Sequence, residues 1–170
     1  MGSPPQLLAA GEQQTLEFFV RRLKEVSEST VDDHELLYNA SVLAHHARVS
    51  THSTVDLTTP ATLVEVFDHF VFDTSLHHDS EMMEAAGAHC LLLAGFFEDQ
   101  LRRRHNIRWY ASLGVGFFRR AADLEASPQK VRLLAAIATG FEPWRQRHAR
   151  LSRYLREQPY LLVGPQRPRR

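Results

Sequence analysis

An imidazole and a thiol stand side by side in the run EMMEAAGAHCLLLAGFF, as His89 and Cys90. A cysteine reacts as its thiolate, which needs a cationic and partly exposed setting. The residues one helical turn from Cys90 are apolar or small, and such a setting raises the pKa of a thiol. The pattern therefore predicts an unreactive Cys90 buried in a helix. For His89 it leaves two interpretations open: a buried neutral side chain bonded to a neighbouring helix, or a ligand to metal or haem.

The histidines form the second group of residues that could do chemistry, and the chain has ten of them. One predicted helix carries polar side chains at helical spacing that end at His45. The helix predicted from about residue 80 would place His77, Glu81 and Glu84 on one face if it began a few residues earlier. These patterns nominate the candidate ligands of a metal or haem site, which are His45, His77, Glu81, Glu84 and His89.

The spacing of these candidate ligands does not reproduce a known metal or enzyme signature. His89 follows Glu84 by five residues, which fits neither the H-E-x-x-H metalloproteases nor the E-x-x-H pairs of di-iron bundles. The chain also lacks a nucleophile-elbow serine motif, a phosphate loop and a dinucleotide-binding glycine fingerprint. We therefore expect a protein that is not an enzyme and that needs no cofactor, with a His/Glu site for metal or haem as the alternative.

A cluster of arginines next to aromatic residues could contact a partner. The stretch RRRHNIRWY contains the candidate partner-binding residues Arg102, Arg103, Arg104, Arg108 and Trp109. Arginine and tryptophan side chains can neutralise phosphates and stack on bases, so binding to nucleic acid is a third hypothesis. The isoelectric point near 7.2 and the acidic remainder of the chain make nucleic acid unlikely, because DNA-binding and RNA-binding domains are usually basic.

The charges of the chain are segregated along the sequence although they sum to zero. Residues 1–100 contain 16 Asp or Glu and four Lys or Arg, and residues 101–170 reverse these numbers. Two arrangements fit this asymmetry: acidic and basic helices pack together inside one chain, or complementary surfaces draw two copies or a partner together. From this asymmetry we expect a homodimer, with the arginines near its interface.

The elements that must position these residues are helices, because apolar residues recur at helical spacing and no segment alternates like a half-buried strand. The pattern predicts an all-α, single-domain bundle of six to seven helices over residues 1–158, followed by a flexible basic tail over residues 159–170. Start signals stand at Asp32 or Asp33, at Thr59 with Pro60, and at Ser127 with Pro128. The predicted helices cover about residues 12–27, 32–47, 60–71, 80–104, 108–125 and 128–140, with a last piece ending near residue 157.

The helix predicted over residues 80–104 is apolar on every face between Ala85 and Phe97. Such a helix is surrounded by others, so we place it at the centre of the bundle, with both His89 and Cys90 buried. Glycines within helices lower helix propensity. Those of this segment and the next, Gly114 and Gly116 among them, therefore predict close helix crossings.

The run CLLLAGFFEDQLRRRHNIRWYASLGVGFFRRAA, from Cys90 to Ala122, is similar to a segment of uncharacterised bacterial helical proteins. The resemblance covers about a fifth of the chain and implies a bacterial helical bundle, without catalytic residues to carry over. No apolar run is long enough to span a bilayer, and the lone cysteine cannot form an internal disulfide. We expect a cytoplasmic protein with an accessory or regulatory role that acts through protein contacts.

Overall fold

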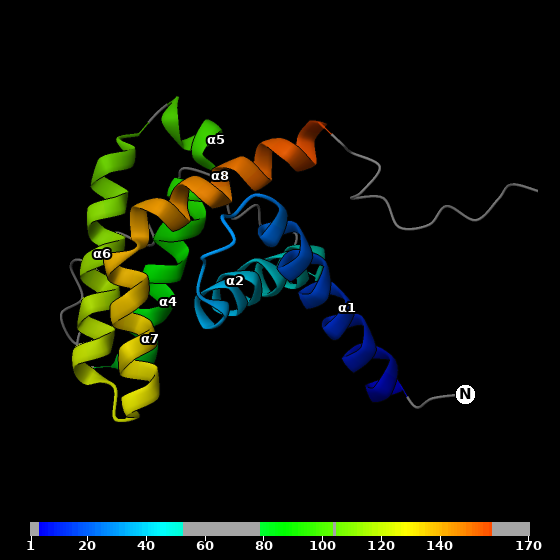
Figure 1. Cartoon of the computed structure of the whole chain (residues 1–170), viewed down its shortest axis with the longest axis horizontal. Coiled ribbons are helices and arrows are strands. Elements are labelled where there is room, and N and C mark those ends of the chain that lie inside the picture. Colours follow the sequence, from blue (N-terminus) through cyan, green and yellow to red (C-terminus); the bar gives the residue numbers. More distant parts are fainter. Residues whose placement is uncertain (1–3, 53–78, 104, 158–170) are drawn as a thin grey trace, which may run out of the picture.

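The computed structural model describes residues 4–52, 79–103 and 105–157, and all regular structure in these residues is helical (Figure 1). The prediction of an all-α fold is confirmed. The predicted helix over residues 60–71 and the predicted tail lie outside the described residues. The elements are α1 (Pro4–Glu25), α2 (Asp33–His52), α4 (Ser80–Leu91), the π-helix η3 (Leu92–Phe96), α5 (Glu98–Arg102), α6 (Ile107–Leu124), α7 (Pro128–Thr139) and α8 (Phe141–Glu157).

The helices begin where short polar side chains satisfy free backbone N–H groups. Asp32 accepts hydrogen bonds from two backbone N–H groups at the start of α2, and Asp79 does the same for α4. Asn106 caps α6 by accepting from the N–H of Arg108. Pro128 opens α7 as predicted, although the Ser127 side chain makes no capping bond.

Helices α4 and α6 form the most extensive packed pair, and glycines make their contact possible. A Cβ atom added to Gly87 would lie 2.8 Å from the Phe118 ring of α6, and one added to Gly114 would lie 3.0 Å from Cys90 Cβ of α4 and 2.5 Å from the Phe141 ring of α8. The prediction of close crossings is confirmed at these positions. It is wrong for Gly116, whose added Cβ would meet nothing within 4 Å.

The predicted helix over residues 80–104 is not continuous. The Phe97 N–H donates to the Leu92 carbonyl at 2.9 Å, which is the wider ladder of a π-helix. Residue Gly95 of this π-helix packs against α8, because an added Cβ would lie 2.9 Å from His148 Cβ. The Ala94 carbonyl accepts a hydrogen bond from Arg145 of α8 at 3.1 Å. Close contact with α8 therefore accompanies the interruption that the apolar pattern did not reveal.

Figure 1 shows α4, α6 and α7 side by side, with α1 and α2 on the other side of the molecule and α8 running across η3 toward α1. One buried hydrogen bond joins α2 to α8, where the His148 Nε2–H donates to Asn39 Oδ1 at 2.8 Å. The Asn39 amide donates in turn to the Glu35 carbonyl at 2.8 Å. Both His148 and Asn39 are fully buried.

The acidic and basic halves of the sequence meet inside the chain. Glu28 lies 2.9 Å from Arg147 on α8, and Glu98 lies 2.9 Å from Arg153 and 3.4 Å from Arg145. This is the first of the two arrangements that the charge segregation allowed, and it explains much of the asymmetry without a second molecule. Across the described ranges, no helix has the length and apolar character needed to cross a membrane.

Candidate functional site

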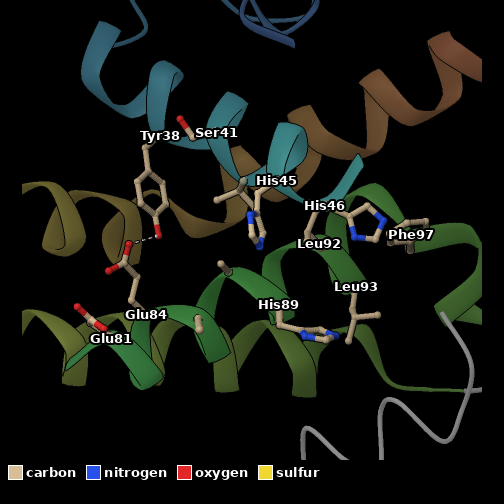
Figure 2. Close-up of a pocket in the computed structure, with 13 residues that line it drawn as sticks. Tyr38, Ser41, His45, His46, Glu81, Glu84, His89, Leu92, Leu93 and Phe97 are labelled. Carbon is tan, nitrogen blue, oxygen red and sulfur yellow. Dashed lines mark hydrogen bonds between the residues drawn. The ribbon is translucent and has the colours of Figure 1, made fainter. Parts of the chain in front are cut away.

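A cavity of about 460 Å³ lies between α2 and the α4–η3 segment (Figure 2). Tyr38 and Glu84 meet at one end of the cavity, and His46 and Phe97 meet at the other. We call this space the histidine cavity. Its lining residues are Tyr38, Ser41, Val42, His45, His46, Glu81, Glu84, Ala85, Ala88, His89, Leu92, Leu93 and Phe97.

One end of the histidine cavity is acidic. The Tyr38 hydroxyl donates to Glu84 Oε1 at 3.1 Å, and Lys130 of α7 lies 2.8 Å from Glu84 Oε2. Burial, and then the nearby Glu84 carboxylate, raise the pKa of Tyr38 above its usual value, so the hydroxyl stays protonated. Glu81 lies one helical turn before Glu84 and is exposed at the rim. This end therefore carries two carboxylates and a phenol, with one ammonium group behind them.

The opposite end of the cavity is apolar. The His46 ring meets the Phe97 ring edge to face, with 5.2 Å between the ring centroids. Leu92 and Leu93 of the π-helix also line this end. The cavity therefore changes from acidic to apolar along α4 and η3, as Figure 2 shows from Glu81 to Phe97.

Two imidazoles, those of His45 and His89, lie between these two ends, and the His46 imidazole lies at the apolar end beside Phe97. Figure 2 shows His45 reaching from α2 into the space above α4, with His89 on α4 below it. Burial, followed by repulsion from His45, lowers the pKa of His46, and burial, followed by repulsion from His46, lowers the pKa of His89. His46 and His89 are therefore neutral at pH 7, in the form that accepts a hydrogen bond or binds a metal.

The structure brings four of the five predicted ligands to one cavity, namely His45, Glu81, Glu84 and His89, whereas His77 lies outside the described residues. Within the described part of the chain, no three His, Cys, Asp or Glu side chains are grouped so that they could hold a metal ion. Sequence reasoning missed His46 as part of the site. Its signal is the doubled histidine at positions 45 and 46, which places one imidazole at the rim and the next beside Phe97.

The His89–Cys90 pair separates into two different environments. Cys90 is fully buried against α6, and burial raises its pKa to about 12, so the prediction of an unreactive thiol agrees with its position. His89 was expected to be buried as well, but it is only half-buried, because its side of α4 faces the cavity and not another helix. Its ring makes no hydrogen bond to another described residue.

The predicted partner-binding residues lie at the corner between α5 and α6. Arg102, Arg103 and Arg108 are exposed, Trp109 is 39% exposed, and Arg104 lies outside the described residues. Arg102 forms an ion pair with the buried Glu98 one turn earlier, so part of its charge is used internally. The corner borders a groove of about 780 Å³ that also reaches Glu142 and Arg145 on α8.

Comparisons of the chain with protein-family models, with curated proteins and with solved structures find no match, so the interpretation of the cavity rests on its geometry.

Proposed function

We propose that this chain is a helical ligand-binding protein and that the histidine cavity is its binding site. The observation that carries the proposal is the convergence of His45, His46 and His89 on one cavity between α2 and the α4–η3 segment. The proposal assigns binding and no reaction. It deepens the alternative drawn from the sequence, because that alternative also used His45 and His89.

The physical argument starts from packing. Protein interiors are nearly as dense as organic crystals, so a cavity of this size between two helices forgoes dispersion contacts. The same helices could have closed on each other with apolar residues, yet they present imidazoles and carboxylates. A π-helix borders the cavity, and such interruptions occur frequently at functional sites. A ligand that fills the space recovers the missing contacts.

The neutral imidazoles favour two kinds of ligand chemistry. A metal ion held by protein groups alone needs three or more donors at matched distances, and the described residues provide no such group. A haem needs only one or two protein ligands, because the macrocycle supplies the others. Otherwise the imidazoles exchange hydrogen bonds with an organic molecule. Titration with haemin separates these cases, because a shifted Soret band that disappears in His89→Ala identifies axial ligation.

The cavity itself is tested with 1-aminoanthracene, an uncharged fluorescent probe of apolar cavities. Ala88 lines the cavity, so Ala88→Trp fills it and is expected to weaken probe binding at least tenfold. Ala135→Trp on the exposed side of α7 is the matched control and leaves binding unchanged. Equal affinity in the Ala88→Trp variant and the original chain would place the probe elsewhere and would overturn the proposal.

A second candidate is the accessory role through protein contacts that we expected from the sequence. It is favoured by the exposed Trp109 next to Arg108 in the sequence, because tryptophan and arginine are enriched at interfaces. Sedimentation at low and high salt tests the expected homodimer. A monomer at high concentration in both conditions argues against it, and a dimer unaffected by Trp109→Ser places the interface elsewhere.

A further inference from the structure

We infer that the ligand of the histidine cavity is an amphipathic organic amine, with its ammonium group at Glu81 and Glu84 and its apolar chain against Leu92, Leu93 and Phe97. This inference rests on the proposed function and names the chemical class of the ligand. It follows from the charge, the hydrogen-bonding capacity and the length of the cavity.

The charge of the lining selects a cation. Glu81 and Glu84 lie one turn apart on α4, and both face the cavity. The described lining contains no lysine or arginine. Lys130 of α7 lines the neighbouring groove and pairs with Glu84 from that side. The charges of Glu81, Glu84 and Lys130 therefore sum to one negative charge. An anionic ligand would add repulsion at this end, whereas an ammonium group compensates the remaining charge.

The imidazoles of the cavity do not oppose a cation at the acidic end. His46 and His89 are neutral, so they add no positive charge that would repel a cation. A neutral imidazole has one nitrogen that accepts a hydrogen bond, and an ammonium group has three N–H donors. The Tyr38 hydroxyl already donates to Glu84 and holds that carboxylate at the acidic end. The Glu81 and Glu84 carboxylates therefore accept from the ammonium group, and neutral His89 offers a further acceptor along the cavity.

The far end of the cavity fits an apolar chain. Leu92 comes eight residues after Glu84, which corresponds to about 12 Å along the helix axis. Leu93 and Phe97 extend the apolar lining beyond that point. Burial of a methylene group against such side chains contributes to affinity in proportion to the area removed from water. A linear amine of about eight carbons can reach from the acidic end to Leu92, where this apolar surface begins.

The experiment compares three molecules with the same eight-carbon chain: n-octylamine, n-octanol and n-octanoate. Isothermal titration calorimetry of the full chain at pH 7.5 and low salt measures their affinities. We expect octylamine to bind at least tenfold more tightly than octanol, because both bury the same chain and only the amine meets the carboxylates. Octanoate is expected to bind most weakly.

A variant pair locates the ammonium group. Glu81→Gln removes one charge from the exposed rim without disturbing the Glu84 pairs, and we expect it to weaken octylamine binding about fivefold and to leave octanol unchanged. Asp123→Asn on the exposed side of α6 is the matched control and leaves both affinities unchanged. An equal loss in the two variants would point to general screening and would contradict the assignment.

The outcomes separate the ligand class from the site. If octanol or octanoate binds as tightly as octylamine, or if octylamine fails to bind while 1-aminoanthracene does, the amine class is wrong and the cavity remains the site. If Ala88→Trp leaves binding of both octylamine and 1-aminoanthracene unchanged, the proposed function fails with it. Octylamine binding that is lost in Ala88→Trp and weakened in Glu81→Gln supports both.

Discussion

The two sides of α4 differ in how they meet their neighbours. Toward α6, Gly87 brings the helix so close that an added Cβ would overlap the Phe118 ring. Toward α2, the helix borders the histidine cavity. The hydrogen bond from Tyr38 to Glu84 lies at one end of this cavity, and the ring contact of His46 with Phe97 lies at the other. The packed side stabilises the fold, and the open side presents chemistry. One apolar helix thus serves both purposes by dividing its surface between them.

The largest expected effect tests the packed side. Gly114→Val adds atoms where a Cβ alone would lie 2.5 Å from the Phe141 ring and 3.0 Å from Cys90. Overpacking of a dense core costs about 3 kcal/mol, so we expect a large loss of stability or failure to fold. Gly116→Val, two residues later where space is open, is the control and costs less than about 1 kcal/mol. Denaturant unfolding measures both, and similar losses in the two variants would contradict the close crossing.

The second prediction concerns acid stability and depends on His148, which joins α8 to α2. Its complete burial lowers its pKa to about 3, whereas an unfolded histidine titrates near about 6.5. The unfolded state therefore binds the proton first as the pH falls. The stability due to the neutral ring is full above pH 6.5 and is lost as the pH falls toward 3. This ring alone is expected to remove roughly 2 kcal/mol between pH 7 and pH 5.

Unfolding of His148→Gln at pH 7 and pH 5 checks this prediction. The variant is less stable at pH 7, since it disturbs the bond to Asn39, but it loses less stability on acidification. His34→Gln, an exposed histidine on α2, is the control and keeps the full pH dependence. His46 and His89 also have lowered pKa values and account for dependence that remains in the variant. An unchanged difference between the two pH values in His148→Gln would show that His148 does not cause the acid sensitivity.

A smaller effect is expected at the acidic end of the cavity. Tyr38→Phe removes the hydroxyl that donates to Glu84 at 3.1 Å, while Lys130 still pairs with that carboxylate. Loss of one hydrogen bond to a charged group that keeps another partner costs about 1 kcal/mol. Tyr154→Phe on α8, away from the cavity, is the control. A loss above about 3 kcal/mol would mean that Tyr38 belongs to the packed core and not to a site boundary.

The sequence predicted local features better than contacts between distant segments. The start signals at Asp32 and Pro128 act within one helical turn, so residue type alone indicates them. The cavity was predicted only in part, because the polar stripe that contains His45 does not reveal which helix it faces. The hydrogen bond between Asn39 and His148 spans 109 residues of sequence, and no spacing rule connects its partners. The sequence also did not predict the π-helix, because the residues Leu92–Phe96 have the composition of an ordinary apolar helix. The hydrogen bond that links this segment to α8, from Arg145 to the Ala94 carbonyl, spans 51 residues of sequence.

The smallest expected change in stability is at His45, and it separates binding from folding most sharply. The residue is exposed at the rim of the cavity, so His45→Gln is expected to change the free energy of unfolding by less than about 0.5 kcal/mol. The same substitution is expected to weaken octylamine binding several-fold, because the ring that reaches from α2 into the cavity is lost. Thermal unfolding and calorimetry on one preparation give both quantities. A stability loss of more than about 1.5 kcal/mol with unchanged affinity would make His45 a packing residue, and the cavity would then be a defect in packing between α2 and α4 and not a site.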